Sequence, residues 1–419
     1  MIENVKRFFR EQSKNYIILA VRRTYASLFN NISMQYNSLY MKTLGLNELS
    51  IGIIRSLGDA ASAIVSPILG FLADNISLKK ALLVAIIIEM LSPTLYYMAW
   101  NWQILTIGAV LGFLSLNIVG LVENLYIANS LRRRSRATGF SIINMTSTIV
   151  SFISPMVAAY IVDRFGGITL QGIKPLYLIQ AIGLAALSPI VIIFLKDIKP
   201  SNGERVKLKE NLKQMFQLIK GRRWLQKFIF LEALGGYVWG VTGPYYMIYA
   251  VEYKGADQWI IGSMGTALNV TSLLSTIPIG RLGDKYGRVK ILTLFRPTFY
   301  ISLIIFLLAP NPWFLVLSWT LRGIFFSTVP LWQTLSLELV PEEDRGKWSG
   351  VKGLIGSLIR IPSATLGGIL WSYFGAQAPF IFALIIDLFV RFPLICTTPE
   401  TLHKEKYFKI YGEKLKSTN

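Results

Sequence analysis

Seven ionisable side chains lie far inside long apolar stretches of this sequence, and each needs a physical reason to be there. They are Asp59, Glu89, Glu123, Glu232, Arg322, Arg360 and Asp387. On insertion scales, an ionised group near the middle of a membrane helix costs about 2.5–3.5 kcal/mol. Groups in such places form ion pairs, relay protons or contact a polar solute. They are therefore the first candidates for function.

Two of these acids have a basic residue four positions away, which is the spacing of neighbours on one face of a helix. Arg55 precedes Asp59, and Arg391 follows Asp387. For Asp387 and Arg391 we expect a structural ion pair. For Arg55 and Asp59, a structural pair and a functional pair both remain open.

The other charges lack an opposite charge within one turn of their own stretch. The acids are Glu89, Glu123 and Glu232, and the bases are Arg296, Arg322 and Arg360. Pairs between helices are open to these groups, and such pairs would be exchangeable as the two halves rock. Arg22 and Arg23 lie near the start of the first stretch, and we expect them to anchor that helix at the membrane interface. A substrate clamp is the alternative.

The helices that position these groups follow from hydropathy. The chain is 53% hydrophobic and 16% charged, whereas soluble domains carry about 25% charged residues. Stretches of about 20 apolar residues predict membrane helices. Twelve are predicted, near residues 20–43, 49–73, 79–100, 103–129, 137–162, 175–196, 224–250, 258–281, 289–309, 312–339, 347–373 and 377–397.

The net charge of +20 lies mostly in short connectors on one side of these predicted helices. Because connectors rich in Lys and Arg stay in the cytoplasm, both termini are expected to be cytoplasmic. The same location argues against a nucleic-acid partner. The connector over 197–223 has lysines spaced among apolar residues, which predicts a basic amphipathic helix on the inner leaflet. A solvated connector is the alternative.

The sequence also repeats itself. The segment Gly70–Asp74 recurs 210 residues later as Gly280–Asp284, and Arg134 recurs 211 residues later as Arg345. Two landmarks with nearly the same offset indicate two similar halves, as in duplicated transporters. The predicted domains are a six-helix bundle over 1–196, the linker 197–223, a second bundle over 224–397 and a cytoplasmic tail over 398–419.

The segment from Gly280 to Lys290 matches the loop Gly-x-Leu-x-Asp-x-x-Gly-Arg-Lys of the major facilitator superfamily, which the chain resembles over nearly its whole length. The first copy keeps Gly, Leu, Asp and the basic end but has Ser77 where glycine is usual. The segment from Pro341 to Gly350 resembles the loop before the eleventh span. The resemblance implies an all-α membrane protein with twelve transmembrane helices in two pseudo-symmetric halves of six.

The repeated loops suggest a gate that holds the halves together and breaks during transport. Gly70 and Gly280 allow close helix approach, while Asp74 and Asp284 can accept hydrogen bonds at a helix N-terminus and pair with arginines. A static loop contact is the alternative. The predicted cytoplasmic gate comprises Gly70, Asp74, Arg134, Gly280, Asp284, Arg288, Glu338 and Arg345.

The resemblance further implies that spans 1, 4, 7 and 10 line a central cavity. Glu123, Glu232 and Arg322 are then best placed to meet substrate or protons, and Glu123 is our first candidate for a proton-carrying residue. A permanent ion pair with an arginine is the alternative. Aromatic side chains suit an amphipathic or ring-bearing substrate. The predicted substrate and coupling residues are Tyr36, Arg55, Asp59, Glu89, Glu123, Glu232, Trp239, Tyr245, Arg322 and Trp332.

The sequence disfavours enzymes and ATP-driven pumps. It has no Walker-type loop and no catalytic constellation, and its only cysteine and histidine are Cys396 and His403 near the end. We therefore expect no cofactor and no metal site. Ser154 to Ala159 keeps the proline and small residues of the pattern in drug–proton antiporters but none of its glycines, which is a slight indication of efflux.

The sequence thus predicts a monomeric secondary transporter of the plasma membrane, which moves a small organic solute by alternating access with proton coupling. Efflux of amphipathic or cationic compounds is slightly favoured, because two acids on the cavity side face one arginine. A second hypothesis is a uniporter or symporter for an anionic metabolite held by Arg322 and Arg360. A third, of another class, is a membrane sensor on the same fold that does not transport.

Overall fold

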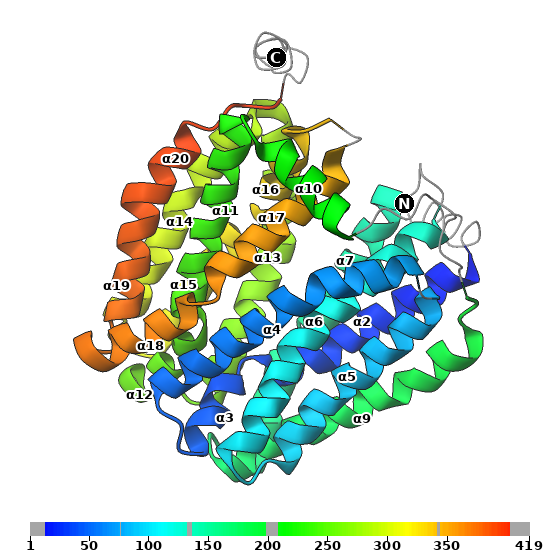
Figure 1. The fold of residues 1–419 in the computed structure, drawn as a ribbon. Coiled ribbons are helices and arrows are strands. Elements are labelled where there is room, and N and C mark those ends of the chain that lie inside the picture. Colours follow the sequence, from blue (N-terminus) through cyan, green and yellow to red (C-terminus); the bar gives the residue numbers. More distant parts are fainter. Residues whose placement is uncertain (1–12, 76, 132–135, 198–207, 342–343, 403–419) are drawn as a thin grey trace. The chain divides into compact units, whose positions relative to one another are not determined.

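The computed structural model describes residues 13–75, 77–131, 136–197, 208–341 and 344–402, with the side chains of 66–75, 136–137, 208–209 and 211–212 left out. Within these ranges every regular element is a helix (Figure 1). The chain divides into two compact units. The first contains Met1–Arg205 with Ala256–Thr266, and the second contains Val206–Gly255 with Ala267–Asn419.

The first unit is a bundle in which α5 packs against α6 and α9, α4 against α6, and α2 against α7 and α9. Its helices are α2 (Lys14–Met34), α3 (Asn37–Thr43), α4 (Glu48–Asn75), α5 (Leu78–Met98), α6 (Trp102–Ser130), α7 (Arg136–Ser151), α8 (Ser154–Arg164) and α9 (Leu170–Phe194).

The second unit is built around α11, which packs against α17, α18 and α19, while α14 packs against α15 and α20. Its helices are α10 (Leu208–Ile219), α11 (Arg223–Thr242), η2 (Gly243–Tyr245), α12 (Tyr246–Lys254), α13 (Gln258–Tyr286, whose first turns belong to the first unit), α14 (Arg288–Leu308), α15 (Trp313–Phe326), α16 (Val329–Glu338), α17 (Arg345–Arg360), α18 (Ser363–Phe374), α19 (Ala378–Ile385), η4 (Ile386–Arg391) and α20 (Phe392–Cys396).

Within the described residues, nine helical segments are long and apolar enough to cross a membrane. They coincide with nine of the twelve predicted spans. The other three predicted spans, 20–43, 49–73 and 224–250, are covered by α2 and α3, by α4, and by α11 and α12. The prediction of an all-helical, multi-pass membrane protein is confirmed, and the count of twelve spans stays a prediction.

The linker helix exists as α10, which packs on α17. Its Leu218 is buried in the core of the second unit, and the Met215 side chain lies against Gly350 of α17. The opposite side of α10 exposes Lys213, Phe216 and Lys220. A basic, partly apolar exposed side suits an interfacial helix, and contact with the inner leaflet remains a prediction.

Polar residues at the junctions start the helices. The Asn101 side chain accepts a hydrogen bond from the Ile104 N–H at 3.0 Å, and the Thr169 hydroxyl accepts one from the Gly172 N–H at 3.1 Å. Such caps satisfy backbone donors that have no partner within the helix. Where a connector lies near hydrocarbon, an unsatisfied donor is costly, so these caps fix where the spans begin.

Glycines allow the helices to approach closely, as is usual in membranes. A Cβ on Gly183 of α9 would lie 2.1 Å from Phe29 of α2. A Cβ on Gly367 of α18 would lie 2.2 Å from the carbonyl oxygen of Val241 in α11 and 2.5 Å from Tyr245. Both contacts set the distance between helices that carry candidate site residues.

Two interruptions shape the second unit. At Gly243–Tyr245 a short 3-10 turn containing Pro244 separates α11 from α12, because proline lacks the N–H that would continue the helix. At Ile386–Arg391 the helix widens into a π turn. Such turns often occur at functional sites, and this one contains both Asp387 and Arg391.

We expect Gly367→Leu to reduce stability, because the new side chain meets backbone that cannot move aside. Overpacking of this kind costs about 1–3 kcal/mol. A lower thermal unfolding midpoint in detergent would show the loss. Gly120→Ala in α6 is the matched control, since a Cβ there meets nothing within 4 Å. An unchanged midpoint for Gly367→Leu would contradict the close approach of α11 and α18.

Candidate functional site

The first unit contains a buried cluster of three charged side chains from three helices. The guanidinium of Arg22 on α2 donates to both Glu89 on α5 and Glu123 on α6. The exposed fractions of these residues are 3%, 6% and 3%. With both acids ionised, the cluster would carry one excess negative charge away from water.

Neutral polar side chains form a chain of hydrogen bonds that begins at the Glu89 carboxylate of this cluster. The Asn30 amide donates to Glu89 at 2.9 Å, the Gln180 amide donates to Asn30 at 3.0 Å, and the Ser33 hydroxyl donates to Gln180 at 2.6 Å. Glu89 therefore accepts from two groups. Among the residues that the structure describes, the only hydrogen-bond donor to Glu123 is Arg22. The two acids thus have different surroundings.

The expectation that Arg22 anchors the helix at the membrane interface is wrong. Arg22 is buried because two carboxylates on neighbouring helices neutralise it, whereas Arg23 is part-exposed and donates to the Asn124 side chain at 2.7 Å. One signal in the sequence could have indicated this arrangement. Two acids without a partner in the first half require a base, and Arg22 and Arg23 are two of the three bases of the predicted first span, with Lys42 at its other end.

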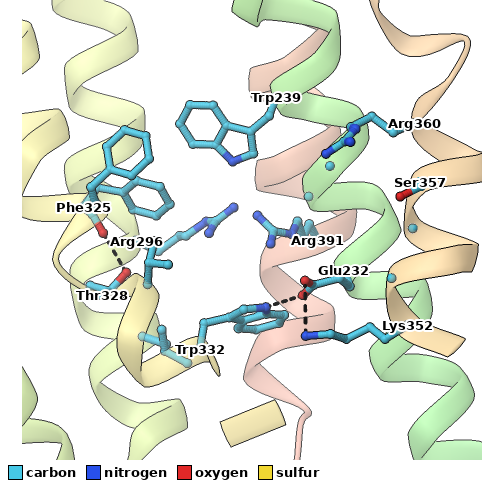
Figure 2. Close-up of a pocket in the computed structure, with 17 residues that line it drawn as sticks. Glu232, Trp239, Arg296, Phe325, Thr328, Trp332, Lys352, Ser357, Arg360 and Arg391 are labelled. Carbon is cyan, nitrogen blue, oxygen red and sulfur yellow. Dashed lines mark hydrogen bonds and ion pairs between the residues drawn. The ribbon is translucent and has the colours of Figure 1, made fainter. Parts of the chain in front are cut away.

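The second unit contains a pocket of about 340 Å³. Side chains of α11, α14, α17 and η4 point into it, together with aromatic residues of α15 and α16 (Figure 2). Its charged and aromatic lining consists of Glu232, Trp239, Arg296, Phe325, Phe326, Trp332, Lys352, Arg360 and Arg391. Glycines of α11 and α17 also line the pocket, together with Leu292, Thr328, Val329 and Ser357.

Two arginines in this pocket share one buried carboxylate. Arg296 Nε donates to Asp387 Oδ1 at 2.8 Å, Arg296 Nη2 donates to Oδ2, and Arg391 Nη1 donates to Oδ2 at 3.3 Å. The Tyr300 hydroxyl also donates to Asp387 at 2.9 Å. The predicted pair of Asp387 and Arg391 is present, and Arg296 from α14 joins it. This cluster carries one excess positive charge.

The predicted site residue Glu232 lies elsewhere on the pocket wall. It pairs with Lys352 of α17 at 3.5 Å and accepts a hydrogen bond from the Trp332 indole N–H. Phe228 stacks on Trp332 with ring centroids 4.7 Å apart. Three predicted residues therefore line this pocket, namely Glu232, Trp239 and Trp332.

Arg322 is not among the residues that line this pocket, and its contact with substrate stays a prediction. It is 3% exposed, and its guanidinium lies 3.9 Å from the ring centre of Tyr246 and 4.7 Å from that of Trp239. Stacking on aromatic faces stabilises such a cation. Tyr245 is also outside the pocket lining, because its buried hydroxyl donates to the Ala364 carbonyl oxygen at 2.6 Å.

The remaining predicted substrate residues lie in the first unit. Arg55 and Asp59 pair at 3.5 Å, and Arg55 lies 3.9 Å above the Phe113 ring. Tyr36 is fully buried at the turn between α2 and α3. The roles of these three residues in transport stay predictions.

The predicted gate is partly described. Arg288 lies 3.0 Å from Asp284 and 3.4 Å from Glu338, while Arg345 donates to the Leu337 carbonyl oxygen at 3.3 Å. A Cβ on Gly280 meets nothing within 4 Å, and the role of Gly280 in close helix approach stays a prediction. Arg134 and the side chains of Gly70 and Asp74 lie outside the described residues.

Sequence reasoning missed two acids that follow the last long helix of each half. Glu400 accepts hydrogen bonds from the Arg288 and Val289 N–H groups, at 2.8 and 2.9 Å. Gly287 has φ +109°, and a Cβ there would lie 2.4 Å from Glu400. In the first unit, Asp197 instead accepts from the Ser77 hydroxyl at 2.8 Å. Each acid therefore caps the helix that follows the repeated loop.

Among the described residues, no group of three or more His, Cys, Asp or Glu side chains could hold a metal ion.

We expect Glu400→Ala to expose the start of α14. Loss of a cap costs about 1 kcal/mol, so the Arg288 and Val289 amides should exchange hydrogen about fivefold faster. Hydrogen–deuterium exchange with mass spectrometry measures this, with the peptide of α15 as internal reference. Glu400→Gln should lie between wild type and Glu400→Ala. Unchanged protection in Glu400→Ala would contradict the capping role.

Comparison with known proteins gives the family. The model of the MFS_1 like family matches residues 25–382. The multidrug resistance protein MdtG of Proteus mirabilis is 24% identical over 378 residues, which cover 86% of this chain and 89% of that protein. MdtG of Escherichia fergusonii is 25% identical over 373 residues, which cover 86% of this chain and 88% of that protein.

Solved structures show the same fold. The nucleoside transporter NupG superposes with a TM-score of 0.71 at 15% identity, covering 95% of this chain and all of that chain. A D-xylose–proton symporter superposes with a TM-score of 0.69 at 14% identity, covering 93% of this chain and 98% of that chain. With the repeated loop and the matching family model, these findings show that the chain belongs to the MFS_1 like family of the major facilitator superfamily of secondary transporters.

Proposed function

We propose that this secondary transporter is coupled to protons and exports amphipathic organic compounds across the plasma membrane, acting as a monomer with both termini in the cytoplasm. Family membership already makes it a transporter and not an enzyme. The observation that carries the proposed coupling is the cluster of Arg22, Glu89 and Glu123.

Charge balance favours one proton in this cluster. Two neighbouring carboxylates repel each other, and a charge that is buried without a partner is costly. Arg22 compensates one of the two acids, and a proton bound to the other makes the cluster neutral. The cluster is thus a site that gains or loses one proton when its surroundings change.

Glu123 is the better candidate to carry that proton. Glu89 accepts a hydrogen bond from the Asn30 amide in addition to that from Arg22. Among the described side chains, Glu123 has Arg22 as its only donor. Protonation of Glu123 would leave Arg22 in an ion pair with Glu89 alone. The ion pairs that join α2, α5 and α6 would then differ, which would favour a different packing of these three helices.

The direction of transport is argued from the relatives. Proteins named multidrug resistance protein MdtG match most of this chain, and Ser154 to Ala159 keeps the proline and small residues of the antiporter pattern. Both favour export of amphipathic compounds. The preference for cations loses its basis, because Lys352 neutralises Glu232 and Arg22 joins Glu123.

An anionic solute is the second candidate, and the two arginines on Asp387 favour it. Arg296 and Arg391 replace Arg322 as the residues that would contact such a solute, since Arg322 does not line the pocket.

We expect Glu123→Gln to uncouple transport from protons. In proteoliposomes loaded with ethidium or 2-naphthoate, a pH gradient should drive wild-type transport of at least one of the two compounds. Glu123→Gln should lower gradient-driven transport at least about tenfold, because the amide cannot exchange a proton, and should keep exchange of labelled for unlabelled compound.

Glu48→Gln is the control, because Glu48 pairs with Lys42 near a helix start, outside the cluster. Equal rates of wild-type transport with and without a pH gradient would contradict proton coupling. Gradient-driven transport at the wild-type rate in Glu123→Gln would remove Glu123 from the mechanism.

A further inference from the structure

The pocket of the second unit has an excess of positive charge at its wall. Arg296 and Arg391 both bond to Asp387, so one carboxylate serves two guanidinium groups. Figure 2 shows the ends of these two arginines pointing toward each other in the pocket. Asp387 is fully buried. The excess positive charge therefore lies on the two guanidinium groups that line the pocket.

The other ion pair at the wall does not remove this excess. Glu232 faces Lys352 at 3.5 Å and also accepts from the Trp332 indole. Each oxygen of Glu232 therefore already has one partner. A cationic ligand would therefore find its acidic partner already engaged and would face two guanidinium groups.

Aromatic faces flank the arginines. Trp239 and Trp332 lie on opposite sides of the two guanidinium groups in Figure 2, and both line the pocket with Phe325. Aromatic rings stack on each other and on guanidinium planes. The wall thus offers a place for a flat ring beside a place for a negative charge.

We propose that this pocket binds organic anions that carry an aromatic ring, with the acidic group at Arg296 and Arg391 and the ring against Trp239 or Trp332. A carboxylate, sulfonate or phosphate accepts two parallel hydrogen bonds from a guanidinium. The volume of about 340 Å³ is at the small end of ligand sites, which suits one or two fused rings. This inference rests on the proposed transport function and names its class of substrate.

Glycines keep the space for the ring and provide a way to test it. A Cβ on Gly353 or Gly356 of α17 meets nothing within 4 Å, and both residues line the pocket. A larger side chain at Gly356 would therefore enter the pocket without displacing another helix. By contrast, a Cβ on Gly235 would lie 2.3 Å from Arg391, so that glycine lets the arginine reach its place.

The test compares three ligands of one shape and different charge. Binding of 2-naphthoate, 2-naphthamide and 2-naphthylmethylammonium to the detergent-purified protein at neutral pH is measured by calorimetry. We expect naphthoate to bind at least tenfold more tightly than the amide or the cation. Gly356→Leu should weaken naphthoate binding at least tenfold. Arg391→Gln should remove the preference for naphthoate over the amide.

Arg164→Gln is the control for charge removal, because Arg164 is an exposed arginine of the first unit, and its preference should match wild type. If Arg391→Gln does not fold, Gly356→Leu still tests the location. The anion proposal would be overturned if naphthoate bound no more tightly than the amide or the cation. It would also be overturned if none of the three ligands bound. Wild-type binding in Gly356→Leu would overturn its location.

These outcomes are separate from those of the transport test. Binding is measured at equilibrium without a membrane or gradient, so it can fail while Glu123 still couples transport to protons. A Glu123→Gln variant with wild-type gradient-driven transport would leave the anion preference of the pocket intact.

Discussion

A charge that is buried away from water must be balanced, and this constraint organises both units. In the first unit, the guanidinium of Arg22 pairs with two carboxylates, those of Glu89 and Glu123. In the second unit, the carboxylate of Asp387 pairs with two guanidinium groups, those of Arg296 and Arg391. Each cluster is one charge short of neutral, with opposite sign. We propose that a proton completes the first and that an organic anion completes the second.

The backbone is shaped to bring these groups together. Gly183 lets α9 approach α2, which carries Arg22, and Gly235 leaves room for Arg391. The π turn at Ile386–Arg391 places Asp387 and Arg391 together where Arg296 of α14 reaches them. The charge pairs cross between helices, so a change in charge at either cluster changes which helix contacts are favourable. This is the property that a transporter with moving helices requires.

Much of the fold was predictable, because membrane helices depend on length and hydropathy, which are local properties of the sequence. Asp387 and Arg391 were also predictable as a pair, since both lie on one helix. The partners of Glu89 and Glu123 were not, because a pair between helices depends on packing, and Arg22 near a helix start is typical of an interfacial anchor. The surroundings of Arg322 were also not predictable, because aromatic side chains around it come from three other helices, α11, α12 and α14. Glu400 was missed because its partners are backbone N–H groups, which no side-chain pattern reveals.

The central claim is that the cluster around Arg22 holds one proton at neutral pH, on Glu123. Infrared difference spectroscopy of the purified protein tests this directly, because a protonated carboxyl group and a carboxylate absorb at different frequencies. We predict a protonated carboxyl band in wild type that is absent in Glu123→Gln. The band should also be absent in Glu89→Gln, because Arg22 then compensates Glu123 alone. A difference spectrum in which Glu123→Gln loses only carboxylate bands would show that both acids are ionised, and would contradict the claim.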